Sequence, residues 1–155
     1  MNNLFFDPET WPGEKILIKL IGAPRPKKNS RRRTKTGKNI ASAKFYEWQQ
    51  LNAGPLKWQL KNLPGAVKSA QALFFIHFVN TKRLVDTDNL NTAAQDVIKD
   101  YKIIIDDNFN LIPGTGGVTI YDKNRDPGTL VYILNPKFET IAEKITRERA
   151  ECLKN

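Results

Sequence analysis

The run Ala72–Val79 constrains the fold more than any other part of the sequence, because it is apolar throughout except for His77. It is rich in aromatic and β-branched residues, which favour a strand over a helix. We therefore expect Ala72–Val79 to form a strand at the centre of a sheet. A histidine in such a strand is predicted to be a hydrogen-bonded residue of the sheet, not a ligand or a base.

Other segments predict the remaining strands and helices. The run 16–21 is short, rich in β-branched residues and closed by Gly22 and Pro24, so it predicts a buried strand. Apolar residues spaced as in an amphipathic helix run from Leu90 to Ile98, and this helix is expected to begin immediately after Asp88. Two more strands are predicted at residues 118–121 and 129–134, and helices near residues 42–51 (ending at Gly54-Pro55), 56–63 and 138–145.

The chain length of 155 residues leaves room for one hydrophobic core, and neither an internal repeat nor a linker divides it. We therefore expect one α/β (α+β) domain spanning residues 1–155. The amino terminus lacks the pattern of a signal peptide, and the apolar runs are shorter than the ~20 residues that span a bilayer, so a soluble, cytoplasmic protein is expected. The single cysteine, Cys152, excludes an internal disulfide and is predicted to pack in the last helix.

Positive charge is concentrated in one segment. The net charge of +9 suggests a polyanionic partner. Eleven Lys and Arg residues and no acidic residue lie between Glu14 and Glu47, which leaves about −2 for the rest of the chain. Residues 25–39 contain no apolar side chain able to anchor a core, so we expect an exposed basic loop, mobile without a partner.

Negative charge gathers between Asp86 and Asp107, where six aspartates face only two lysines. In an extended segment, Asp86 and Asp88 would project from one face, and two carboxylates held together call for a cation. Mg²⁺ takes one or two carboxylates together with water and phosphate oxygens, so this pair suits a metal that also contacts a nucleic-acid backbone. Asp106 and Asp107 could complete the cluster.

Simpler interpretations of the acidic residues remain open. Asp88 could cap the following helix, and Asp106-Asp107-Asn108 could form a turn. The segment Gly114–Gly117 lacks the continuation of a phosphate loop and is interpreted as a flexible connection. Trp48 and Trp58 lie on helical apolar patterns, which favours core packing over stacking on bases.

Several of these features, taken in order, resemble the RusA-like Holliday junction resolvases, small endonucleases of phages and bacteria. Gly22-Ala-Pro24-Arg-Pro26-Lys27 and Asn29 resemble the start of the family's basic loop, and Ser42, Tyr46 and Trp48 the start of the next helix. Asp86-Thr-Asp88-Asn89 is similar to the family's DxDN signature, and Asp106-Asp107 follows at the spacing of its acidic pair. The similarity covers roughly residues 16 to 134.

The resemblance implies a mixed β-sheet flanked by helices and a nuclease site. It implies catalytic roles for Asp86, Asp88 and Asp107, and metal binding by these three and Asp106, with Mg²⁺ or Mn²⁺ as the ion. One position departs from the family, because Thr92 lies where a catalytic lysine is expected. Lys82, Arg83 or a residue of the basic loop could supply this charge. The DNA-binding residues expected in the loop are Lys27, Lys28, Asn29, Arg31, Arg32, Arg33, Lys35 and Lys38.

The resemblance therefore implies a homodimeric, metal-dependent hydrolase that resolves four-way DNA junctions in recombination and repair. The alternative, favoured by Thr92, is a relative with weakened catalysis that binds branched DNA or RNA without cutting it.

Overall fold

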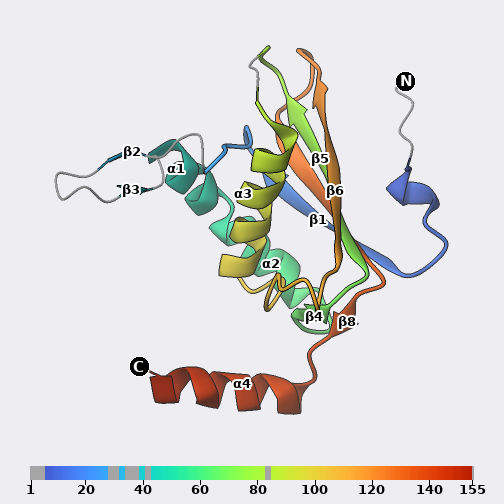
Figure 1. The fold of residues 1–155 in the computed structure, drawn as a ribbon, viewed down its shortest axis with the longest axis vertical. Coiled ribbons are helices and arrows are strands. Elements are labelled where there is room, and N and C mark those ends of the chain that lie inside the picture. The colour runs from blue at the N-terminus through green and yellow to red at the C-terminus, as the bar shows by residue number, and fades with distance from the viewer. Residues whose placement is uncertain (1–5, 28–31, 34–38, 41–42, 83–84, 155) are drawn as a thin grey trace.

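A four-stranded mixed sheet forms the centre of the molecule. The computed structural model describes residues 6–27, 32–33, 39–40, 43–82 and 85–154. The strands follow the order β1-β7-β5-β6, with β1 at Lys15–Ile21, β7 at Gly128–Leu134, β5 at Ala72–Val79 and β6 at Gly114–Tyr121. Strand β5 pairs antiparallel with β7 and parallel with β6. The expected α/β class and the internal position of Ala72–Val79 are confirmed (Figure 1).

Three helices cover one face of this sheet: α1 (Ala43–Leu51), α2 (Ala53–Lys61) and α3 (Thr87–Asp100). Their apolar side chains, such as Phe45, Leu56 and Val97, pack with Phe75 and Ile133 of the sheet in one buried core. The opposite face carries a smaller cluster, covered by residues near the 3-10 helix η1 (Pro8–Thr10), including Phe6 and Trp11. The predicted helix boundary at Gly54-Pro55 is wrong, because both residues lie in the first turn of α2, where proline costs no hydrogen bond.

Side chains from the helices complete the free edge of the sheet. Among the described strands, β1 has a neighbour on one side only, so alternate backbone groups on its other side lack a strand partner. The Asn52 side chain accepts from Ile21 N at 2.8 Å and donates to Ile21 O at 3.1 Å. The Gln59 side chain pairs in the same way with Lys19 N and O, at 2.8 and 2.9 Å. These two amides continue the hydrogen-bond pattern of the sheet and attach α1 and α2 to it.

The predicted flexible connection at Gly114–Gly117 is wrong, because these residues begin strand β6. Glycine is required there by close packing and not by turn geometry. A Cβ on Gly117 would lie 2.5 Å from Asn91 Oδ1 and 2.9 Å from Phe75 O. The absence of side chains thus lets α3 and β5 approach β6 closely.

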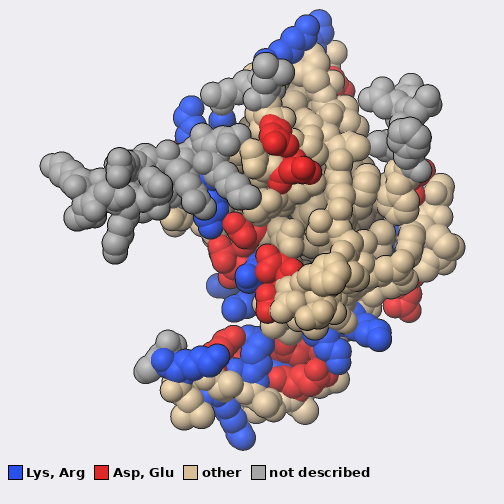
Figure 2. Space-filling view, viewed as in Figure 1, with Lys and Arg blue, Asp and Glu red and all other residues tan. Residues whose placement is uncertain are grey.

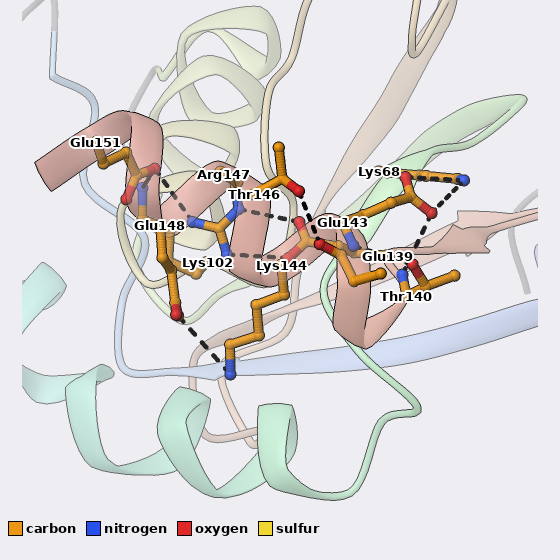
Figure 3. A network of polar contacts seen from close by, with 11 residues as sticks. Lys68, Lys102, Glu139, Thr140, Glu143, Lys144, Thr146, Arg147, Glu148 and Glu151 are labelled. Carbon is orange, nitrogen blue, oxygen red and sulfur yellow. Dashed lines mark hydrogen bonds and ion pairs between the residues drawn. The ribbon is translucent and has the colours of Figure 1, made fainter. Parts of the chain in front are cut away.

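The carboxy-terminal helix α4 (Ile141–Lys154) has no buried residue and lies beside the rest of the molecule (Figure 1). Figure 3 shows the polar contacts that hold it. Arg147 donates to the buried Glu139 carboxylate at 3.0 and 3.2 Å, and Lys68 donates to Glu143 at 3.0 Å. The prediction that Cys152 packs is therefore wrong, because this residue is exposed.

Two short strand pairs complete the described structure. Strand β4 (Val67–Ser69) pairs with β8 (Lys137–Phe138), so Phe138 precedes the last helix instead of opening it. Strand β2 (Arg32–Arg33) pairs with β3 (Asn39–Ile40), and this pair projects beside α1 (Figure 1). The basic loop therefore contains a short ribbon that the sequence did not predict. None of the described helices has both the length and the apolar character needed to cross a bilayer.

Candidate functional site

Asp86 and Asp88 lie where α3 begins, at the end of the sheet where β5 and β6 end. Asp86 is the N-cap of α3: its backbone is extended, with φ −67° and ψ 122°, and its side chain accepts from Asp88 N at 3.0 Å. Both aspartates are exposed, and neither forms an ion pair with the described residues. Among the described residues, one oxygen of Asp86 and the whole Asp88 carboxylate therefore have no partner.

The local geometry differs from the extended segment that we expected. The helix begins at Thr87, before Asp88, so Asp88 lies in the first helical turn. The interpretation that Asp88 caps the helix is wrong, because the capping residue is Asp86. The Thr87 side chain points away from the pair, with its hydroxyl 2.8 Å from the Thr119 hydroxyl on β6. This contact attaches the start of α3 to the sheet.

A buried chain of polar side chains attaches the next turn of α3. His77 Nε2 lies 2.7 Å from Asn91 Oδ1, and His77 Nδ1 lies 2.9 Å from Thr129 Oγ1 on β7. Burial of the ring lowers the pKa of His77 to about 4, although the hydrogen bond to Asn91 opposes this shift. His77 is thus a hydrogen-bonded histidine of the sheet, as predicted, and it fixes the position of α3 from inside the core.

Sequence reasoning missed Asn91, although a signal was present. Asn91 precedes Ala94 by three residues and Ile98 by seven, so it lies on the apolar face of the helix. A polar residue on that face, opposite a histidine in the central strand, predicts a buried hydrogen bond. Asn91 is 8% exposed.

Thr92 occupies the position where the resemblance implies a lysine. Its hydroxyl donates to Asp88 O at 2.9 Å, within the helix itself. Lys82, one of the predicted substitutes, lies with its Nζ 5.6 Å from the centre of the Tyr121 ring. Arg83, the other residue near the signature, lies outside the described residues.

Asp106 and Asp107 form a second acidic group around Lys99. The Lys99 ammonium lies 3.1 Å from Asp107 Oδ1 and 3.9 Å from Asp106 Oδ1. The hydrogen bond to Asp107 raises the pKa of Lys99, and Asp106 and Asp96 act in the same direction. Lys99 therefore neutralises part of this group.

The structure places the two acidic groups towards opposite ends of α3. Eleven residues separate Asp88 from Lys99, or about 16 Å along the helix axis. Figure 2 shows separate patches of acidic side chains along α3, with basic side chains beside the lower ones. Among the described residues, no group of three or more His, Cys, Asp or Glu side chains could hold a metal ion. The four predicted ligands thus form two pairs.

The predicted DNA-binding residues of the basic loop are only partly described. Lys27 forms an ion pair with Asp96 at 3.3 Å and lies 5.4 Å above the Phe45 ring, which fixes the start of the loop against α3 and α1. Arg32 and Arg33 belong to β2. The other predicted contacts, Lys28, Asn29, Arg31, Lys35 and Lys38, lie outside the described residues, as does the predicted helix cap Ser42.

Trp48 and Trp58 differ in burial. Trp48 is buried, as expected, and its indole donates to Ile21 O at 3.0 Å. Trp58 is 68% exposed, so its predicted core packing is wrong.

Comparison with models of known protein families gives no match, and neither does comparison with curated proteins. The site is therefore assigned from its own chemistry and from the resemblance in sequence.

Proposed function

We propose that this protein is a metal-dependent endonuclease that cuts branched DNA, with four-way junctions as its substrate. The observation that carries the proposal is the pair Asp86 and Asp88. Both carboxylates are exposed at one helix end, and neither has a cationic partner among the described residues. The same chain carries a segment of eleven Lys and Arg residues that suits a phosphate backbone.

Asp86 and Asp88 fit a hard divalent cation. Mg²⁺ binds through one or two carboxylates and keeps water and phosphate oxygens as its other ligands, so two carboxylates are sufficient. When bound, the ion would supply an activated water and neutralise charge on the scissile phosphate. The hydrogen bonds Thr87–Thr119 and His77–Asn91 attach the start of α3 to the sheet and so fix the position of the two aspartates.

Asp106 and Asp107 enter the proposal as a separate element. Their ion pairs with Lys99 support a role in neutralising the charge of that lysine. Because they lie towards the other end of α3, a role for Asp107 in cutting requires its own test. Asp107→Asn and Asp86→Asn make that test. Loss of cutting in both variants would support a shared site, whereas loss in Asp86→Asn alone would confine the site to the start of α3.

The proposal is tested with a labelled synthetic four-way junction and Mg²⁺ or Mn²⁺. Asp86→Asn is expected to abolish cutting and to leave junction binding equal or tighter, because one negative charge near phosphate is lost. Glu148→Gln on α4 is the matched control, since it removes an exposed carboxylate far from the pair. Cutting by Asp86→Asn at the wild-type rate would refute the assignment.

Binding without cutting is the second candidate, and Thr92 is the observation that favours it. A cation near the scissile phosphate can contribute about 3 kcal/mol to the transition state, or around a hundredfold in rate. Thr92→Lys is therefore expected to raise cutting by about that factor if the metal pair works and only the cation is lacking. Retained junction binding, with no cutting by wild type or Thr92→Lys under any metal, would favour the binding protein.

A further inference from the structure

Two loops leave the same end of the sheet, next to the start of α3. Strands β5 and β6 run parallel, with Val79 opposite Tyr121, so both end at this edge. The described chain then continues into residues 80–82 after β5, resumes at 85–86 before α3, and continues into residues 122–127 after β6. Asp122 N donates to Val79 O at 2.9 Å and ties the two loops together.

Among the described residues, three exposed cations lie on these loops: Lys82, four residues before Asp86, and Lys123 and Arg125 after β6. We call them the strand-end cations. None of them forms an ion pair with another described residue, in contrast to Lys27 and Lys99, which are paired with aspartates. Figure 2 shows Lys and Arg side chains gathered at this end of the molecule, above the uppermost carboxylates.

Aromatic rings hold two of these cations in place. The Arg125 guanidinium carbon lies 3.6 Å from the centre of the Phe78 ring, and Lys82 Nζ lies 5.6 Å from that of Tyr121. A guanidinium stacked on a ring keeps its N–H donors at its edge, where they can grip a phosphate with two parallel hydrogen bonds. Such an arginine loses little side-chain freedom when a phosphate binds.

Asp122 and Asp126, in the loop after β6, reduce the positive charge of this surface. Asp122 Oδ1 accepts from Asn124 N at 2.9 Å and so caps its own turn, while Asp126 is exposed. Over the sequence of both loops, the cations Lys82, Arg83, Lys123 and Arg125 and the carboxylates Asp86, Asp122 and Asp126 leave a net charge of +1. The surface therefore suits a few directed phosphate contacts and not general attraction of any anion.

We propose that the strand-end cations bind backbone phosphates of the nucleic acid, as a second contact surface separate from the basic loop. Lys82 lies four residues before Asp86 in the sequence. Arg125 stacks on Phe78, which belongs to the apolar cluster on the sheet face opposite α3, so the strand-end cations lie around the end of the sheet and not beside α3 alone. The inference rests on the proposed function, because it names a second surface that binds the same nucleic-acid substrate.

The test is fluorescence anisotropy with a labelled four-way junction, in the absence of Mg²⁺, at several NaCl concentrations. The Lys123→Ala, Arg125→Ala double variant is expected to weaken binding at least fivefold. It should also lower the slope of log affinity against log salt by about 2, since each lost phosphate contact removes about 0.9. Arg149→Ala with Lys154→Ala on α4, both exposed, removes the same charge elsewhere and should leave the slope unchanged.

Arg125→Lys separates stacking from charge, because it keeps the charge and loses the two-pronged donor. It should weaken binding less than Arg125→Ala but measurably, with an unchanged melting temperature. An equal loss of junction affinity in the strand-end and α4 double variants would overturn the inference, since net charge alone would then explain binding. The absence of junction binding by the wild-type protein would also overturn it. Binding that depends on the strand-end cations without any cutting would refute the nuclease and leave this surface standing.

Discussion

His77 shows how one residue fixes the place of a helix. An amide oxygen can only accept, so His77 Nε2 donates to Asn91 Oδ1, and the Thr129 hydroxyl donates to Nδ1. The ring also stacks on Phe75, with 5.9 Å between ring centres and 4° between planes. The imidazole is therefore neutral and fully engaged, which suits a structural bridge between β7, β5 and α3.

The buried imidazole makes stability depend on pH. The folded-state pKa of His77 is about 4, below the value of 6.5 for a free side chain, so the unfolded chain binds a proton first as the pH falls. The contribution of His77 to the free energy of unfolding should therefore be complete above pH 6.5. It should decrease by at most about 3 kcal/mol as the pH falls to 4. Urea titrations across this range measure it. The difference between wild type and His77→Gln should itself vary with pH, and a constant difference would contradict the assignment.

Asn52 and Asn62 form a matched pair of residues. Each donates to the carbonyl four residues before it, but Asn52 is fully buried and also pairs with both backbone groups of Ile21. Asn52→Ala should lower the free energy of unfolding by about 3 kcal/mol, because buried partners lose their hydrogen bonds, and Asn62→Ala by less than about 1 kcal/mol. Chemical denaturation of both variants tests this, and equal losses would mean that the edge of β1 does not need Asn52.

At the level of elements, the glycines of β6 set how closely α3 approaches the sheet. A Cβ on Gly117 would clash with the Asn91 side chain and with the Phe75 carbonyl oxygen of β5, whereas a Cβ on Gly116 would meet only the Phe74 ring, at 3.6 Å. Gly117→Ala should therefore cost about 2 kcal/mol by forcing Asn91 or the backbone to move, and Gly116→Ala should be close to neutral. Thermal and urea unfolding distinguish the two. A neutral Gly117→Ala would show that α3 can shift without cost.

Elements with a clear apolar pattern could be predicted from the sequence, and those that depend on neighbours could not. The runs at Ala72–Val79 and from Leu90 to Ile98 carry their own periodicity, and both form the expected element. Strand β6 begins with three glycines among its first four residues, so its start depends on packing against β5 and α3. Helix α4 has the periodicity of a packed helix, yet ion pairs hold it and its apolar residue Ile141 is 80% exposed.

The candidate site residues were proposed from the sequence, but their arrangement could not be predicted from it. The spacing of Asp86, Asp88 and Asp107 is a property of the sequence, whereas their separation depends on α3 being straight over fourteen residues. Lys99 lies seven residues beyond Thr92, about 10 Å along the helix axis, and it pairs with Asp106 and Asp107. The polar chain through His77 joins three elements, so no local pattern could reveal it in full.

At the level of the whole molecule, opposite charges are divided between separate surfaces. The basic loop carries most of the excess, and the described start of that loop is fixed against α3 by Lys27 and Asp96. One set of acidic side chains lies along α3 and the loop that follows it (Figure 2). A phosphate backbone drawn to the loop would therefore be brought close to carboxylates that would repel it without a cation.

This division predicts how the loop contributes to binding. Replacing Arg31, Arg32 and Arg33 with alanine should weaken binding to nucleic acids of any sequence to a similar degree, because phosphate contacts carry little sequence information. The slope of log affinity against log salt should fall by about 2 to 3, as three counterion-releasing contacts are lost. Replacing Lys57, Lys61 and Arg149, which are exposed on α2 and α4, gives the same change of net charge. Anisotropy titrations with two unrelated junction sequences compare these two triple variants. If the slope falls equally in the loop variant and in the control variant, the loop arginines contribute only net charge and make no specific phosphate contacts.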